Sequence, residues 1–269
     1  MPICSLPTVD IHYSILTSDT RETNTTFKPK LVLLHGLLLG NLASWYLSVA
    51  PYLSQKYDVL MYDLRGHGKS SCPKVGYRVE DGVDDLQGLL SHLGWWGESI
   101  AIAGHSYGGL IALKFSMMYS QWVRCLALID TPLPPSQLEE LNHFQSFDAQ
   151  EILKALPTEL ATLLSQGGRR SRKSLERWSL LLLETTLMKA LREEDDLTDD
   201  QLSKIDCPVL AIYGSRSSCL PTLERLCRFV PDCEHYILQD TGHYILNERP
   251  QSVRDHLSEF LNQSLYGHL

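Results

Sequence analysis

The sequence lacks any apolar stretch long enough to cross a membrane as a helix, which takes roughly 18 residues or more. Residues Met1 to Ser5 contain no basic segment followed by an apolar one, so we expect no secretory signal peptide. The sequence therefore predicts a cytoplasmic protein that does not bind membranes.

Cysteine is present seven times but never as C-x-x-C. An odd number without that spacing argues against a disulfide framework and against a zinc knuckle. We expect reduced thiols, with Cys125 and Cys207 filling apolar strands. No histidine and carboxylate residues are spaced as metal ligands, so no metal is predicted.

Phosphate-binding motifs are also missing. The sequence has no G-x-x-x-x-G-K-[ST] run, and Gly36 and Gly40 lack the third glycine of a dinucleotide motif, so no cofactor is expected. The net charge is −8, which argues against non-specific binding to nucleic acids. The expected partner is a small, apolar molecule, and nothing in the sequence indicates an oligomeric state.

The composition of the 269 residues, 43% hydrophobic and 21% charged, predicts a packed α/β protein. Continuous apolar runs, typical of strands covered on both faces, occur at 30–34, 58–62, 99–103, 124–129 and 208–214. Further strands are predicted at 9–15 and 234–238, and helices at 42–55, 83–93, 109–119, 221–230 and 250–261. This alternation favours a mostly parallel sheet with helices on both faces.

The pattern changes between residues 133 and 202, where leucine-rich helical spacing replaces the strands. Pro134-Pro135, Pro157 and Gly167-Gly168 interrupt it. We interpret 133–202 as a helical cap inserted between two parts of one core, 1–132 and 203–269. Its basic cluster at 169–173 and acidic run at 193–200 are interpreted as a solvated surface, with a docking surface as the alternative.

The segment Gly104-His105-Ser106-Tyr107-Gly108 follows an apolar strand and precedes an apolar helix. A G-x-S-x-G motif in that context is typical of a nucleophile elbow, a sharp turn that raises the serine above the sheet edge. The alternative is an ordinary glycine-rich turn. Because a serine hydroxyl is a poor nucleophile, Ser106 requires a base within hydrogen-bond distance and an acid to orient that base.

Four motifs in order give the chain a resemblance to the α/β-hydrolase superfamily, in its cap-bearing branch, over nearly the whole length. They are His35-Gly36, Asp63-Leu64-Arg65-Gly66-His67-Gly68-Lys69-Ser70, the Ser106 elbow and Gly242-His243. The resemblance implies an α/β-hydrolase fold with a mostly parallel eight-stranded sheet and a helical cap. Since the histidine comes last in the family's chain order, it implies His243 as the base.

The acid is where the sequence departs from the common family pattern. Many members carry an aspartate in G-x-x-D-x-x-x-P, whereas here the run from Gly214 to Pro221 has Ser217 at that position. The family also uses a second location, after the strand that follows the elbow helix, and Asp130 lies there. We therefore assign Asp130 as the acid. The alternative is that Asp130 only caps a loop and the site is a Ser-His dyad.

The resemblance further implies an oxyanion hole made by the backbone N–H groups of Tyr107 and Leu37. Four side chains are predicted to line an apolar substrate pocket beneath the cap: His35, Leu38, Leu133 and Trp178. His35 is alternatively interpreted as fixing its loop by hydrogen bonding.

The leading hypothesis is a serine hydrolase that cleaves an ester, thioester or lactone through an acyl-enzyme. A biosynthetic thioesterase or cyclase acting on a carrier-protein-bound acyl group is one form of it. A second hypothesis is a cofactor-independent dioxygenase or C–C bond hydrolase that uses the His-Asp pair. A third is a non-catalytic, ligand-binding receptor. A serine at the elbow argues against epoxide hydrolases and haloalkane dehalogenases, whose nucleophile is a carboxylate.

Overall fold

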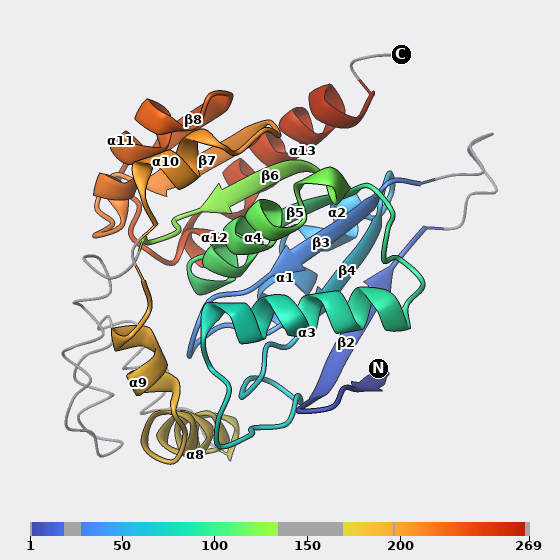
Figure 1. Ribbon diagram of the computed structural model, residues 1–269, viewed down its shortest axis with the longest axis vertical. Helices are drawn as coiled ribbons and strands as arrows, with labels where there is room; N and C mark the ends of the chain where they lie inside the picture. The colour runs from blue at the N-terminus through green and yellow to red at the C-terminus, as the bar shows by residue number, and fades with distance from the viewer. Residues whose placement is uncertain (1, 19–27, 134–168, 196, 267–269) are drawn as a thin grey trace.

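The computed structural model describes residues 2–18, 28–133, 169–195 and 197–266, which build one eight-stranded sheet (Figure 1). The strands are Ile3–Ser5 (β1), Asp10–Leu16 (β2), Lys30–Leu34 (β3), Asp58–Tyr62 (β4), Ile100–His105 (β5), Val123–Ile129 (β6), Val209–Gly214 (β7) and Cys233–Leu238 (β8). Their order is β1-β2-β4-β3-β5-β6-β7-β8. Only the β1–β2 and β2–β4 pairs of this sheet are antiparallel. The predicted fold class is confirmed.

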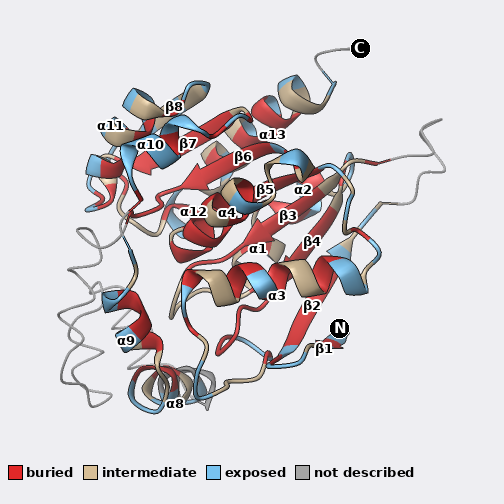
Figure 2. Ribbon diagram, viewed as in Figure 1, coloured by how far each residue is buried: buried red, intermediate tan, exposed pale blue. Residues whose placement is uncertain are grey.

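Strand β3 shows why the central strands are continuously apolar. Leu31 and Leu33 point into one hydrophobic core, and Val32 and Leu34 point into the other. One face is covered by α1 (Ala43–Tyr46), α2 (Ala50–Leu53), α12 (Ile245–Glu248) and α13 (Pro250–Tyr266). The opposite face is covered by α3 (Val79–His92), α4 (Tyr107–Met118) and α11 (Leu220–Phe229). Figure 2 shows the resulting buried layer of strands between helices with exposed outer faces.

The predicted helix over 42–55 is instead two short helices, α1 and α2, with Leu47 to Val49 between them. Pro51 lies in the first turn of α2. A proline there has no N–H to donate and clashes with the carbonyl four residues earlier, so one continuous helix cannot pass through it. The sequence prediction was wrong here because it weighed apolar spacing above this break.

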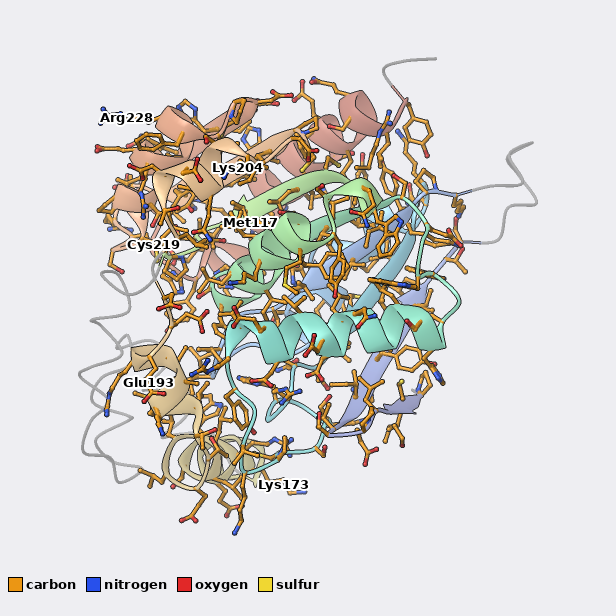
Figure 3. All side chains as sticks on the ribbon, viewed as in Figure 1. Met117, Lys173, Glu193, Lys204, Cys219 and Arg228 are labelled. Atoms are coloured by element: carbon orange, nitrogen blue, oxygen red, sulfur yellow. The ribbon has the colours of Figure 1, made fainter. Side chains whose placement is uncertain are left out.

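The described part of the 133–202 segment contains the helices α8 (Arg169–Leu183) and α9 (Leu187–Arg192) and most of α10 (Asp199–Ser203), and no strand. Trp178, Leu181 and Leu187 pack into the same core as α3 and α4, so these helices are docked on the sheet domain. Pro134-Pro135, Pro157 and Gly167-Gly168 lie outside the described residues. Lys173 and Glu193, labelled in Figure 3, are exposed. The boundaries at 133 and 202 stay a prediction.

None of the helices that the structure describes combines the length and apolar character of a membrane span.

Candidate active site

Ser106 lies in the turn between β5 and α4 with φ 53° and ψ −123°. A non-glycine residue held at positive φ costs on the order of 1–3 kcal/mol, so the surrounding structure must enforce it. The Ser106 N–H donates to the carbonyl of Ile129 at 2.9 Å, which ties the turn to β6. A Cβ at Gly104 would overlap the backbone of Gly108, because strand and helix cross closely there. The local geometry is that of a nucleophile elbow.

His243 follows β8 and faces both the serine and the candidate acid. Its Nε2 lies 2.9 Å from Ser106 Oγ, and its Nδ1 lies 2.6 Å from Asp130 Oδ2. His105 Nε2 donates to the His243 backbone carbonyl at 2.9 Å. The residue before the serine therefore helps to hold the loop that carries the imidazole, a role that the sequence analysis missed.

Asp130 is fully buried directly after β6, at φ 46°. Its Oδ1 accepts a hydrogen bond from Gly214 N at 3.0 Å. Its Oδ2 accepts from Ser217 Oγ as well as from His243. The structure thus joins Ser106, His243 and Asp130 in one hydrogen-bonded chain, and places Ser217 in contact with the same carboxylate.

The electrostatics of His243 reflect two opposed effects. Burial favours the neutral ring, but the hydrogen bonds to Asp130 and Cys219 and the nearby negative charge outweigh it and raise the pKa of His243 above its ordinary value. Cys219 Sγ lies 3.6 Å from His243 Nδ1, a contact that no pattern in the sequence indicates. A site that stabilises the imidazolium suits a group that must accept a proton.

Asp130, Cys219 and His243 each bring one potential metal-ligand atom within 4.8 Å of the others. The sequence spacing did not indicate this cluster. The carboxylate and imidazole atoms concerned are already hydrogen-bonded to each other.

The two candidate oxyanion residues belong to the start of α4 and to the loop after β3. Tyr107 begins α4, so its N–H belongs to the first helical turn, whose N–H groups have no intrahelical acceptor. The loop after β3 approaches the serine closely, since a Cβ at Gly36 would lie 3.0 Å from the Cβ of Ser106. Leu37 follows in that loop. Its assignment and that of Tyr107 stay predictions.

Two buried histidines hold this loop against the loop after β4. His35 Nε2 accepts from Leu64 N at 3.0 Å, and its Nδ1 donates to Gly36 O at 2.8 Å. His67 Nε2 accepts from Leu38 N at 3.0 Å. Burial lowers the pKa of His35 to about 4 and that of His67 to about 3, so both rings are neutral acceptors. With both nitrogens of His35 engaged, the ring fixes the loop; a pocket role for it stays a prediction.

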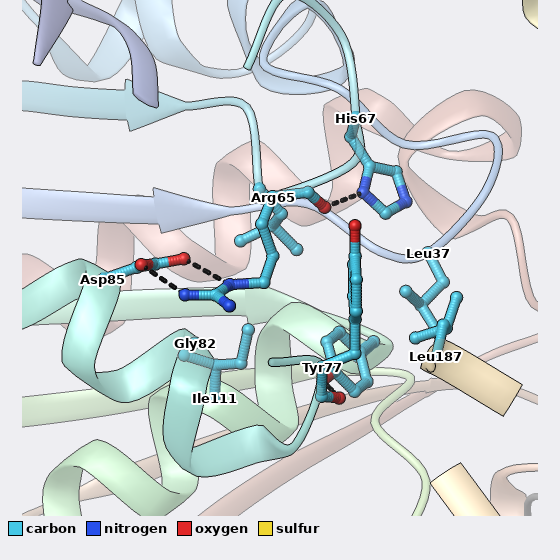
Figure 4. Close-up of a pocket in the computed structure, with 10 residues that line it drawn as sticks. Leu37, Arg65, His67, Tyr77, Gly82, Asp85, Ile111 and Leu187 are labelled. Carbon is cyan, nitrogen blue, oxygen red and sulfur yellow. Dashed lines mark hydrogen bonds and ion pairs between the residues drawn. The ribbon is translucent and has the colours of Figure 1, made fainter. Parts of the chain in front are cut away.

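A small cavity of about 10 Å³ lies beside this loop (Figure 4). Leu37, Leu187 and Tyr107 line it together with the buried ion pair of Arg65 and Asp85. Its volume suits about one water molecule, which is far less than an acyl chain.

Of the other predicted pocket residues, Leu133 and Trp178 are buried in the core, and Leu38 packs against it half-buried. Their contact with a substrate stays a prediction.

Comparisons with known proteins agree with this architecture. A family model described as alpha/beta hydrolase fold matches residues 29–182. The uncharacterized hydrolase YugF of Bacillus subtilis is 23% identical and covers 94% of both chains. The 2-hydroxy-6-oxo-6-(2'-aminophenyl)hexa-2,4-dienoic acid hydrolase of Metapseudomonas resinovorans is 24% identical over 91% of this chain and 88% of its own.

Among solved structures, a bacterial membrane phospholipase A superposes with a TM-score of 0.80 at 23% identity, over 98% of this chain and 86% of that one. The match of sheet order, elbow and family model leads to one conclusion: this chain belongs to the alpha/beta hydrolase fold family.

Proposed function

We propose that this protein is a serine hydrolase that cleaves an ester, thioester or lactone with an apolar acyl or alkyl part. The observation that carries the proposal is the continuous hydrogen-bonded chain from Asp130 Oδ2 through both nitrogens of His243 to Ser106 Oγ. In this role Ser106 is the nucleophile, His243 the general base and Asp130 the acid that orients it.

Acylation begins when Ser106 Oγ attacks the substrate carbonyl carbon and its proton passes to His243 Nε2. Asp130 stabilises the resulting imidazolium through Nδ1, at 2.6 Å. The backbone N–H groups of Tyr107 and Leu37 donate hydrogen bonds to the negatively charged oxygen of the resulting tetrahedral intermediate. His243 then donates its proton to the departing alcohol, thiol or ring oxygen, and the C–O or C–S bond breaks.

Deacylation repeats these steps with water as the nucleophile. His243 takes a proton from the water as it attacks the acyl carbon, and returns it to Ser106 Oγ as the acid leaves. If a hydroxyl of the acyl group replaces the water, the same steps release a lactone. An acyl group bound to a carrier protein as a thioester falls within the proposed substrate class.

The apolar character of the loop residues Leu37 and Leu38 supports an apolar substrate. Leu187 of α9 and Leu37 both line the small cavity, and their side chains lie next to each other in Figure 4. An apolar surface beside the nucleophile favours acyl or alkyl chains over polyanions.

The test is rapid-mixing kinetics with p-nitrophenyl butyrate. We expect a burst of nitrophenolate equal to the enzyme concentration, and an acyl adduct on Ser106 in peptide mass spectrometry. Ser106→Ala should lower kcat by roughly a thousandfold or more. Unchanged ester turnover in that variant, with its fold intact, would overturn the proposal.

A C–C bond hydrolase is the second candidate. The Metapseudomonas resinovorans relative, whose match covers 91% of this chain, is named as a hydrolase of a dienoic keto acid. Cofactor-independent oxygenation belongs to the same group of reactions, in which His243 and Asp130 remove a substrate proton. Turnover of a dienoic keto acid that survives Ser106→Ala but is lost in His243→Ala would favour this group over ester hydrolysis.

A further inference from the structure

Ser217 lies buried in the turn that follows β7, next to the candidate acid. Its Oγ accepts a hydrogen bond from Cys219 N at 3.1 Å and donates one to Asp130 Oδ2. Because an ionised carboxylate can only accept, the hydroxyl hydrogen points to Asp130 Oδ2, while a lone pair of the same hydroxyl accepts from the Cys219 N–H. Ser217 is therefore a fixed donor to Asp130.

The carboxylate of Asp130 is held by donors on both oxygens. Gly214 N binds Oδ1 at 3.0 Å, while Ser217 and His243 share Oδ2. Without the Ser217 hydroxyl, the described residues that fix the rotation of the carboxylate plane by hydrogen bonds would be Gly214 and His243. The turn from Gly214 to Ser217 thus determines where Oδ2 points.

We propose that Ser217 is a positioning residue that orients Asp130 toward His243. The proposal rests on the proposed serine-hydrolase function. Its geometric basis is that Ser217 Oγ and His243 Nδ1 contact one and the same oxygen atom.

The first experiment measures the labelling rate of Ser106 by a fluorophosphonate, which does not depend on the natural substrate. The serine oxygen bonds to phosphorus, fluoride leaves, and His243 takes the serine proton. Ser217→Ala should slow labelling by roughly tenfold, because a hydrogen bond to a charged group is lost. Ser217→Thr, which keeps the hydroxyl, should recover most of the rate, and Ser218→Ala, at an exposed neighbour, should leave it unchanged.

The same variants are assayed with p-nitrophenyl butyrate. A positioning role predicts that Ser217→Ala lowers kcat with little change in KM, and shifts the acid limb of the pH profile. Equal labelling rates in Ser217→Ala and wild type would overturn the proposal.

Asp130→Asn is the second test, and it should label slowly. If Asp130→Asn labels as fast as wild type, the assignment of Asp130 as the acid fails, and the positioning role of Ser217 fails with it. The serine-hydrolase proposal is decided separately, by Ser106→Ala.

Discussion

The Nε2 atom of His67 accepts a hydrogen bond from the backbone N–H of Leu38, 3.0 Å away. Leu38 has φ 57°, which is unfavourable for a residue other than glycine. The contact with His67 helps to hold this backbone conformation in place. Two more bonds join the same loops, from Leu42 N to Asp63 Oδ1 at 2.8 Å and from Leu64 N to His35 Nε2 at 3.0 Å. The loop beside Ser106 is thus fixed by the loop after β4.

His67→Phe is expected to impair catalysis more than substrate binding. The phenyl ring fills the space but leaves the Leu38 N–H without its acceptor, so the candidate oxyanion donor Leu37 loses its support. We expect kcat to fall by roughly 10- to 100-fold, below the full cost of removing an oxyanion donor, with KM little changed. His67→Gln, whose amide oxygen can accept that bond, should lose less. Equal activity of the two variants would argue against this role of His67.

Arg177 connects the cap helix α8 to the same loop. Its guanidinium donates to the carbonyls of Gly66 at 3.0 Å, His67 at 3.4 Å and Ser70. Arg177→Met removes these bonds and should lower the free energy of unfolding by about 1–2 kcal/mol and kcat/KM several-fold. Lys173→Met, an exposed change on the same helix, is the control. Chemical denaturation and ester kinetics are measured on both variants. Equal losses of stability and activity in the two variants would contradict the role of Arg177 as an anchor between α8 and this loop.

The raised pKa of His243 predicts the pH dependence of the reaction. A general base acts in its neutral form, so kcat/KM should rise with pH along a limb centred above the ordinary value of 6.5. Cys219→Ala removes one of the groups that raise this pKa and should move the limb to lower pH, whereas Cys227→Ala, at an exposed site, should not. A limb at or below 6.5 in the wild type would count against this prediction.

The same shift of His243 stabilises the folded state below about pH 6.5, and this contribution is lost as the pH rises through the raised pKa.

Three other histidines have the opposite effect on stability. Burial lowers the pKa of His35 and His105 to about 4 and that of His67 to about 3. Between pH 6.5 and about 4 these rings are neutral in the folded protein but take up protons when it unfolds. Their contribution to the free energy of unfolding is therefore complete above pH 6.5 and is lost as the pH falls toward 4.

Each of these histidines contributes at most roughly 1.4 kcal/mol per pH unit to the slope of the unfolding free energy against pH. Urea denaturation at a series of pH values measures this slope. His67→Gln should reduce the slope by the amount that corresponds to one proton. A flat dependence between pH 6.5 and 5 would rule out three neutral buried rings.

The sequence by itself determined the layers of this protein. Strands covered on both faces must be apolar along their whole length, so runs such as 30–34 and 58–62 are recognisable without any partner. The serine turn is local in part, because Gly104 is required by the crossing of β5 and α4. A Cβ at Gly108 would instead meet the backbone of Leu34 and His35, and one at Gly109 the side chain of Thr131, so these two glycines answer to tertiary neighbours. The break between α1 and α2 was equally local, in Pro51, but the apolar spacing concealed it.

The tertiary structure alone decided which distant groups meet. Ser217 and Asp130 are 87 residues apart, and Arg177 and Ser70 are 107 apart, so no spacing in the chain encodes these contacts. They arise because parallel strands bring their carboxyl ends to one edge, where each following loop meets loops from other strands. A serine in place of an aspartate at position 217 showed in the sequence only as a missing acid, whereas in the fold its hydroxyl donates a hydrogen bond to the carboxylate of Asp130.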